Sequence, residues 1–317
     1  MPTSFYSFAN VIAAGLEQAG YTVVIANDEY PNNIWGRLIG KLRVHGLLSA
    51  ITRRVLARRF LAGRQYALAL IIKGRGMSPA LLAAVRAHAQ YTVAYNFDSF
   101  KFNPAPLAWL THVDRYVTFD YADAERHALP LVDLFSSLPV DAAPKAVRYE
   151  VSAILRNHSE RLQYVDQVFA ATGSKNTFLY VFEQNLFTFA FNFLRSPRLY
   201  LKYWDHISFK ALPYKDYIAV LKSSDFTVDY AHPSQTGITI RCFEAVSAQT
   251  KFITNNPYVL RNAWFTDANA IVFKRGGDAA ELARQYQARR GLGGAAHHRS
   301  IADFLRELTA RPAAPAR

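Results

Sequence analysis

The sequence predicts an α/β protein built from two similar units. Short apolar segments rich in β-branched residues alternate with segments of helical periodicity, and this alternation starts again after residue 148. The length of 317 residues suits two domains of roughly 150 residues each. Hydrophobic residues make up 51% of the chain and charged residues 19%, so each unit has enough apolar side chains for a packed core.

The first half of the chain opens with a helix and continues with strands. Apolar residues recur at helical spacing over 8–19, and Gly20 is a natural end for that helix. Ser78 and Pro79 suit the N-cap and the first position of a second helix, over 78–89. Strands are expected at 21–28, 66–74, 91–98 and 114–120. Because these segments are apolar throughout, we expect a parallel sheet covered on both faces.

The second half repeats this order after a seam at 139–148. Its strands are expected at 149–155, 176–183, 226–231 and 251–256, and its helices at 159–172, 214–225 and 239–248. We therefore expect two Rossmann-like domains facing a cleft, over 1–145 and 146–275, followed by C-terminal helices and a disordered tail over 276–317. A doubly wound domain normally opens with a strand. Either the N-terminal sheet lacks its first strand, or the natural chain begins upstream of Met1.

The composition limits the compartment and the partners. Cys242 is the only cysteine, so no internal disulfide forms and a reducing compartment fits best. The N-terminus has no signal-peptide pattern, and no apolar stretch reaches the roughly 20 residues of a spanning helix, so we expect a cytoplasmic protein. The net charge of +13 suits an anionic partner. No zinc-finger, RNP or leucine-zipper pattern accompanies this charge, so nucleic acid is not the expected partner.

The most punctuated stretch, HPSQTGITIRCFEAVSAQTKFITNN, covers residues 232–256. It leads from the end of an expected strand into a helix N-terminus, where free N–H groups and the helix dipole favour an anion. Gly237 has no side chain to keep a ligand from the backbone, and Arg241 is a planar cation suited to phosphate. This pattern predicts a phosphate-binding turn.

Three further residues of the stretch fit the same ligand. Thr236 and Thr239 are able to cap the helix or to bond phosphate oxygens, and Glu244 is placed to accept ribose hydroxyls. The alternative is an ordinary helix with a threonine cap, a glycine turn and a surface glutamate.

The segment TGITIRCFEAVSAQTKFITNN resembles the donor-binding region of GT-B fold glycosyltransferases, especially bacterial capsule and lipopolysaccharide sugar transferases and their CgeB-like relatives. The segments DYAHPSQTG, IIKGRGMS, YNFDSF and VTFDYAD are similar to the same group. The resemblance implies that the backbone of Gly237, Ile238 and Thr239 receives the donor diphosphate, and that Glu244 holds the nucleotide ribose. Many retaining members carry an acidic residue where Thr236 stands, so the stereochemistry stays open.

Other candidates lie where strands are expected to end. His158 and Arg161 are placed to contact the donor phosphate or an acceptor hydroxyl, although Ser159 is equally suited to cap an ordinary helix. Asp98 is the first candidate for the base that deprotonates an acceptor hydroxyl, and Asp120 is the second. The alternative for Asp98 is a carboxylate that stabilises a turn.

No metal site is expected, because His297 and His298 lie in a loop rich in glycine and alanine without an Asp-x-Asp triplet. We expect no cofactor either, since a nucleotide-sugar donor is a substrate. A helix dipole and arginines then stabilise the leaving diphosphate.

Two further segments are rich in apolar residues, one together with arginines and the other with several phenylalanines. Segment 36–60 alternates apolar residues with arginines, which predicts a basic helix on an anionic membrane surface, peripheral to the inner face of the membrane. Its alternative is a helix that covers the core and exposes a solvated basic face. The aromatic run 187–194 is expected to pack in the core rather than form a sugar platform.

Together these observations predict a metal-independent glycosyltransferase. It would move a hexosyl or related sugar from a nucleotide-sugar donor to a growing surface polysaccharide or a lipid-linked glycan. A nucleotide-sugar epimerase or another GT-B fold transferase would keep the same diphosphate pocket. A non-catalytic nucleotide-binding scaffold would bind the nucleotide without turnover.

Overall fold

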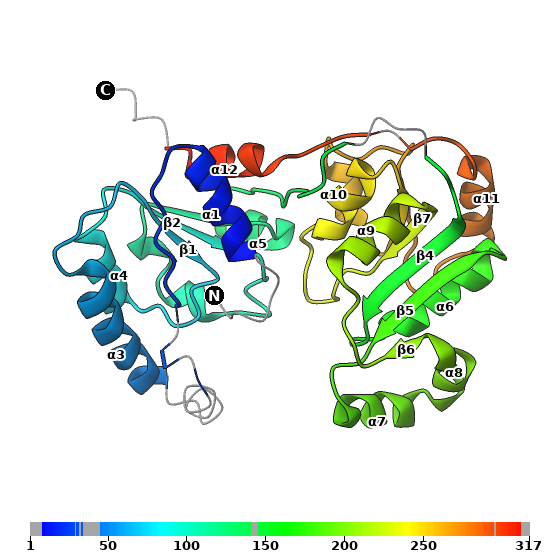
Figure 1. The fold of residues 1–317 in the computed structure, drawn as a ribbon, viewed down its shortest axis with the longest axis horizontal. Coiled ribbons are helices and arrows are strands. Elements are labelled where there is room, and N and C mark those ends of the chain that lie inside the picture. Colours follow the sequence, from blue (N-terminus) through cyan, green and yellow to red (C-terminus); the bar gives the residue numbers. More distant parts are fainter. Residues whose placement is uncertain are drawn as a thin grey trace. The chain divides into compact units, whose positions relative to one another are not determined.

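The computed structural model describes residues 8–28, 30–31, 33, 45–140, 145–294 and 296–311. The chain divides into two compact units (Figure 1). The first comprises Met1–Leu134, Ser234–Gly237 and Ile301–Arg317, and the second comprises Phe135–Pro233 and Ile238–Ser300. Each unit contains a parallel sheet, which confirms the predicted α/β class.

The sheet of the first unit has the strand order β1-β2-β3, with β1 at Ala69–Ile72, β2 at Thr92–Asn96 and β3 at Arg115–Thr118. Its helices are α1 (Phe8–Gln18), α3 (His45–Leu56), α4 (Pro79–Arg86), α5 (Tyr121–His127) and α12 (Ile301–Thr309). Shorter turns of helix lie at Ala57–Leu61, Ala105–Ala108 and Leu110–His112. As predicted, Ser78 caps α4 by accepting a hydrogen bond from the N–H of Leu81, and Pro79 occupies the first position.

Residues 21–28 do not form the predicted strand. A β-branched segment becomes a strand only where a neighbouring backbone supplies hydrogen-bond partners. This segment instead lines an apolar cavity of about 250 Å³ together with residues of α1 and β1, and Val24 and Ile25 stay exposed.

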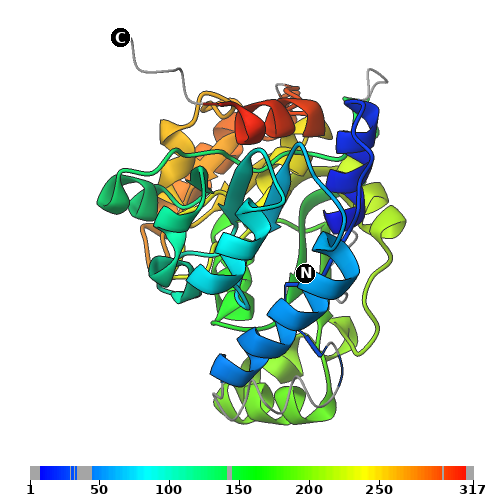
Figure 2. The same cartoon turned by 90° about the vertical axis from the view of Figure 1, so that its left-hand side faces the viewer.

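Helix α12, from the end of the chain, belongs to the first unit. It packs on α1 so closely that a Cβ atom added to Gly15 would lie 2.7 Å from Leu305 Cδ1 (Figures 1 and 2). Phe304 meets the ring of Tyr95 edge-on, with centroids 5.2 Å apart. Helices from the N-terminal and the C-terminal parts of the chain therefore pack together in this unit.

The sheet of the second unit has the order β6-β5-β4-β7-β8-β9. Its strands are β4 (Tyr149–Arg156), β5 (Thr177–Phe182), β6 (Ile207–Ser208), β7 (Ser224–Asp229), β8 (Lys251–Thr254) and β9 (Ala270–Val272). Its helices are α6 (Arg161–Thr172), α7 (Leu186–Arg195), α8 (Pro197–Lys202), α9 (Tyr214–Lys222), α10 (Ile240–Ser247) and α11 (Ala279–Arg289), with short turns at Trp204–His206 and Pro257–Arg261. The core includes the buried rings of Tyr164, Phe226 and Tyr286.

The aromatic run 187–194 is only partly in this core. Phe189 and Phe193 pack against it, whereas Phe187, Phe191 and Leu194 are exposed. The expectation of core packing was therefore wrong for half of the run, because a helix of this length turns one face to the sheet and one away from it.

The described part of the basic segment 36–60 packs against the core of the first unit. Leu48 and Leu56 of α3 are buried, and Leu56 belongs to a cluster with Leu61, Leu81 and Val85. Arginines of the segment remain exposed: Arg53, Arg54, Arg58 and Arg59. This arrangement favours the alternative of a core-covering helix with a solvated basic face. None of the described helices is long and apolar enough to cross a membrane.

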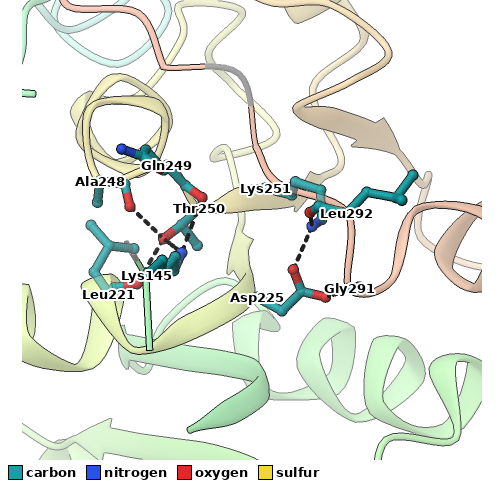
Figure 3. A network of polar contacts seen from close by, with 9 residues as sticks. All are labelled: Lys145, Leu221, Asp225, Ala248, Gln249, Thr250, Lys251, Gly291 and Leu292. Atoms are coloured by element: carbon teal, nitrogen blue, oxygen red, sulfur yellow. Dashed lines mark hydrogen bonds and ion pairs between the residues drawn. The ribbon is translucent and has the colours of Figure 1, made fainter. Parts of the chain in front are cut away.

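A buried ion pair joins the amino ends of β7 and β8 to the chain after α11 (Figure 3). Lys251 pairs with Asp225 and donates to the carbonyl oxygen of Leu292, and its side chain is 1% exposed. Asp225 Oδ2 also accepts from the N–H of Gly291 at 2.9 Å. Because each charge is paired and hydrogen-bonded, the cost of burying both is offset.

We expect Asp225→Ala to destabilise the protein by about 3–5 kcal/mol, because it leaves the Lys251 ammonium buried without a counter-charge. The double change Asp225→Leu with Lys251→Met should recover most of this loss. Chemical denaturation measures both. Arg284→Gln, which removes an exposed pair with Glu281, is the control and should leave stability nearly unchanged. Equal losses in the single and double variants would contradict this account.

Candidate anion-binding site

Two helix N-termini lie side by side at one edge of the second unit's sheet. Strands β4 and β7 are adjacent and parallel, with Val151 opposite Phe226. Helix α6 follows β4 and α10 follows β7, so both helices start at the carboxyl edge of the sheet. The N-cap residues Glu160 and Thr239 make no side-chain capping hydrogen bond. The first N–H groups of both helices thus form a site of positive potential suited to an anion.

An arginine stands in the first turn of each helix, Arg161 on α6 and Arg241 on α10. Within the described residues, neither guanidinium forms an ion pair, and the buried Nε atom of Arg161 has no hydrogen-bond partner. Burial, and next the positive charge of Arg241, lower the pKa of Arg161 to about 10. Two cations close enough to repel each other are an arrangement that a phosphate or diphosphate group would stabilise.

The loop between β4 and α6 places His158 beside these two arginines. Ser159 and Glu160 both adopt left-handed backbone conformations, with φ of 53° and 65°, which non-glycine residues hold at a cost of about 1–3 kcal/mol each. The ring centroid of His158 lies 6.1 Å from that of His232. Burial of the ring, followed by the charges of Arg161 and Arg156, lowers the pKa of His158 to about 3. The imidazole is therefore neutral at pH 7, which makes it a hydrogen-bonding group and a weak base.

A buried carboxylate, Asp229, fixes the start of α10. Asp229 ends β7, is 1% exposed, and accepts hydrogen bonds from the hydroxyls of Thr239 at 2.7 Å and Thr254 at 2.9 Å. The Thr239 hydroxyl therefore points to the strand ends rather than to the amides of its own helix. Thr239 therefore occupies the N-cap position, but its side chain does not cap the helix.

The preceding residues are held in the first unit by Asp120. Its carboxylate accepts hydrogen bonds from the N–H of Thr236 at 2.6 Å, from the Thr236 hydroxyl at 2.7 Å and from the N–H of Gly237 at 3.3 Å. It also caps α5 by accepting from the N–H of Asp123. Of the backbone amides predicted to meet a diphosphate, the amide of Gly237 is bonded to Asp120 in this conformation. Asp120, the second candidate for the base, acts here as an acceptor for this turn.

Gly237 is needed here for packing. A Cβ atom at this position would lie 2.2 Å from Cε2 of Phe119, and the neighbouring Ile238 is also buried. The backbone of Gly237 does not adopt a positive φ, so the absence of a side chain is the property that matters. The sequence pattern indicated a close approach at this glycine, and the structure shows that its partner is an aromatic ring.

Glu244 lies in the second turn of α10 and is buried. Its two carboxylate oxygens accept hydrogen bonds from the hydroxyls of Tyr214 and Tyr217, each at 2.8 Å, and burial raises its pKa. A carboxylate oxygen has more than one lone pair, so a ribose hydroxyl is able to share this acceptor. Both tyrosines lie on α9, which precedes β7 and α10 in the chain. No feature of the sequence indicated that they would contact Glu244.

Asp98 lies apart from these residues in sequence and belongs to the first unit. Its Oδ2 atom is 2.8 Å from Nζ of Lys73, and its Oδ1 accepts from Nε2 of Gln235 at 3.3 Å. A base that forms an ion pair must lose or share that partner to take a proton. Among the described residues there is no cluster of three or more His, Cys, Asp or Glu side chains that could hold a metal ion.

The chain was compared with protein families, with curated proteins and with solved structures. Residues 182–311 match the model of a family described as glycosyl transferase-like. A search of curated proteins gives no match. Two solved structures are similar over most of the chain. AviGT4, described as a glycosyltransferase involved in avilamycin A biosynthesis, is 12% identical with a TM-score of 0.53, over 96% of this chain and 83% of that one.

The second is sucrose-phosphate synthase from Thermosynechococcus elongatus, which is 12% identical with a TM-score of 0.51, over 89% of this chain and 82% of that one. A UDP-GlcNAc 2-epimerase from Methanocaldococcus jannaschii is also similar, at 10% identity and a TM-score of 0.46, over 84% and 81% of the two chains. Identities this low show a shared fold alone. The chain therefore has the GT-B fold, and its residues 182–311 are similar to the glycosyl transferase-like family.

We expect Gly237→Ala to destabilise the first unit by about 1–3 kcal/mol, because the added methyl overlaps the ring of Phe119. Thermal or chemical denaturation measures this loss. The second change Phe119→Leu, made in the Gly237→Ala protein, should recover part of it by opening space beside the methyl. If Gly237→Ala leaves stability unchanged, the contact with Phe119 does not explain this glycine.

The pKa of His158 gives a separate check of the cation cluster. We expect the His158 imidazole to stay neutral from pH 8 down to pH 5, since burial and the adjacent arginines disfavour its charged form. Replacing both Arg161 and Arg241 with Gln should raise this pKa. An NMR titration of the imidazole protons, with the His158→Asn spectrum as assignment control, measures both. A wild-type pKa near 6.5 would contradict this account, and an unchanged pKa in the double arginine variant would show that the arginines do not act on the imidazole.

Proposed function

We propose that this chain is a glycosyltransferase that takes a sugar from a nucleotide-sugar donor, and that the donor diphosphate lies at the paired N-termini of α6 and α10. The observation that carries the proposal is the pair of uncapped helix ends with Arg161 and Arg241 in their first turns. Helix dipoles and guanidinium groups stabilise the charge that develops on a leaving diphosphate. The glycosyl transferase-like match over 182–311 includes α10 and Arg241, which supports the same assignment.

In this proposal the remaining residues have distinct roles. His158 donates or accepts a hydrogen bond at the diphosphate or at an acceptor hydroxyl, and Glu244 accepts ribose hydroxyls. Thr236, Gly237, Ile238 and Thr239 form the turn that brings α10 to the donor. Asp98 is the base for the acceptor hydroxyl, provided that Lys73 gives up its ion pair. No metal ion and no cofactor other than the donor takes part.

The proposed acceptor is a growing surface polysaccharide or a lipid-linked glycan, and the proposed place of action is the cytoplasmic side of a membrane. The net charge of +13 supports an anionic environment of this kind. Incubation with candidate donors, followed by mass analysis, tests the reaction class. Free sugar with a nucleoside diphosphate supports a transferase, an epimerised sugar nucleotide indicates an epimerase, and an unchanged donor that still binds indicates a scaffold.

The diphosphate assignment predicts weaker binding when either arginine is replaced. A hydrogen bond to a charged group contributes about 1.5–3 kcal/mol, so Arg161→Gln and Arg241→Gln should each weaken nucleoside diphosphate binding roughly ten- to a hundredfold. Calorimetry with UDP, GDP and CDP measures this change, and Arg284→Gln on α11 is the matched control. Wild-type affinity in both site variants would place the diphosphate elsewhere.

Glu244 is tested by comparing two ligands, one with a ribose and one without. If Glu244 holds the ribose, Glu244→Ala should weaken binding of the best nucleoside diphosphate about tenfold or more and leave inorganic pyrophosphate binding unchanged. The arginine variants should weaken both ligands. Equal weakening of both ligands by Glu244→Ala would instead show that Glu244 acts by holding Tyr214 and Tyr217 of α9 on α10.

A further inference from the structure

Helices α7 and α8 lie beyond the β6 edge of the second unit's sheet (Figure 1), and several of their apolar side chains are exposed. One face of α7 is fixed, because Phe189 and Phe193 lie 5.6 and 6.0 Å from the ring of Tyr200. The opposite face carries Phe187, 81% exposed, and Leu194, 78% exposed. We define the α7–α8 surface as the large exposed apolar residues between 186 and 204: Leu186, Phe187, Phe191, Leu194, Leu201 and Trp204.

This surface is held rigidly in place. Asn185 and Thr188 form a capping box at the start of α7, and Asn192 donates to the buried carboxylate of Glu183. Trp204 meets the anchored ring of Phe189 edge-on at 5.9 Å. A helix that is apolar on both faces is normally buried on both. A group of large apolar side chains exposed in one region of the surface marks a place that another phase or molecule covers.

The charges beside the patch indicate what covers it. From residue 186 to 210 the chain has four lysines and arginines, all exposed, and a single acidic residue, Asp205. The cations are Arg195, Arg198, Lys202 and Lys210, of which Lys202 pairs with Asp166 of α6. The guanidinium of Arg195 lies over the ring of Phe191 at 5.6 Å. Long cationic side chains of this kind extend along apolar groups and keep their charge at the level of lipid headgroups.

We propose that the α7–α8 surface docks the protein onto an anionic lipid bilayer, with the apolar side chains at the acyl boundary and the cations among the headgroups. This composition of phenylalanine, leucine and tryptophan with lysine and arginine is that of an interfacial helix. A second copy of the chain fits less well, because a two-fold contact would bring the same cations face to face. The proposal does not depend on the proposed reaction.

The basic segment of α3 provides an internal comparison. With its continuation over Ala57–Leu61 it has four exposed arginines, which equals the number of cations beside the α7–α8 surface, yet Leu48 and Leu56 are buried and hold it on the first unit. Bare positive charge attracts the protein to anionic lipid only weakly and with strong dependence on salt. We therefore expect substitutions on the α7–α8 surface to weaken vesicle binding much more than substitutions of the α3 arginines.

Co-sedimentation with vesicles tests the proposal. Wild type should sediment with vesicles of phosphatidylcholine containing 30% phosphatidylglycerol, in the manner of a surface-bound protein. The double variant Phe187→Glu with Leu194→Glu should reduce the bound fraction at least about tenfold. Leu260→Glu with Leu292→Glu, which alters two exposed leucines elsewhere on the second unit, should not. Changing the four arginines of α3 and its continuation to glutamine should have a much smaller effect than the α7 variant.

Trp204 supplies a readout that does not rely on sedimentation. Its emission should shift to shorter wavelength on adding the anionic vesicles, and Trp204→Phe should remove that shift while leaving the emission of the other tryptophans unchanged. Circular dichroism confirms that the variants fold. The proposal is overturned if wild type fails to bind the vesicles, or if the α7 variant binds as well as wild type. It is also overturned if ultracentrifugation shows a dimer that the α7 variant dissociates, because the surface then covers a second copy.

Discussion

Two buried carboxylates fix the stretch between residues 236 and 239, and the candidate site depends on them. Asp120 binds the amides of Thr236 and Gly237 in the first unit, and Asp229 binds the hydroxyl of Thr239 in the second. A buried carboxylate is stable only when its oxygens accept hydrogen bonds, so each of them requires its partners. Because the Thr239 hydroxyl bonds to Asp229, the N-terminus of α10 starts at the strand ends with its first amides uncapped.

The positive charges of Arg161 and Arg241 at this helix end repel each other, and the neutral imidazole of His158 lies beside them. Arg161 and His158 have lowered pKa values because burial and neighbouring positive charge disfavour their protonated forms, and the loop that carries them holds two consecutive left-handed residues. Such an arrangement costs stability, and proteins keep it where a ligand relieves the strain. A dianion between the arginines would offset the repulsion, so the same feature that destabilises the folded chain also favours binding of a diphosphate.

The two apolar segments with flanking arginines show how packing assigns different roles to similar compositions. In α3 Leu48 and Leu56 are buried against the first unit, whereas Arg53 and Arg54 are exposed. In α7 two phenylalanines are sufficient to anchor the helix, which leaves Phe187 and Leu194 exposed among cations. Burial of apolar area is what distinguishes them, and it depends on which other elements lie near.

The sequence alone determined the α/β class, the order of most strands and helices, and the position of a polar turn before α10, because these follow from local periodicity and from cap and turn residues such as Ser78 and Pro79. It also identified Arg161, His158 and Arg241 at helix starts. Only the tertiary structure decided that residues 21–28 lack a strand partner, that Gly237 packs on Phe119, and that Glu244 meets Tyr214 and Tyr217. These contacts join residues far apart in the chain, and local patterns do not record which distant side chain fills a space or accepts a hydrogen bond.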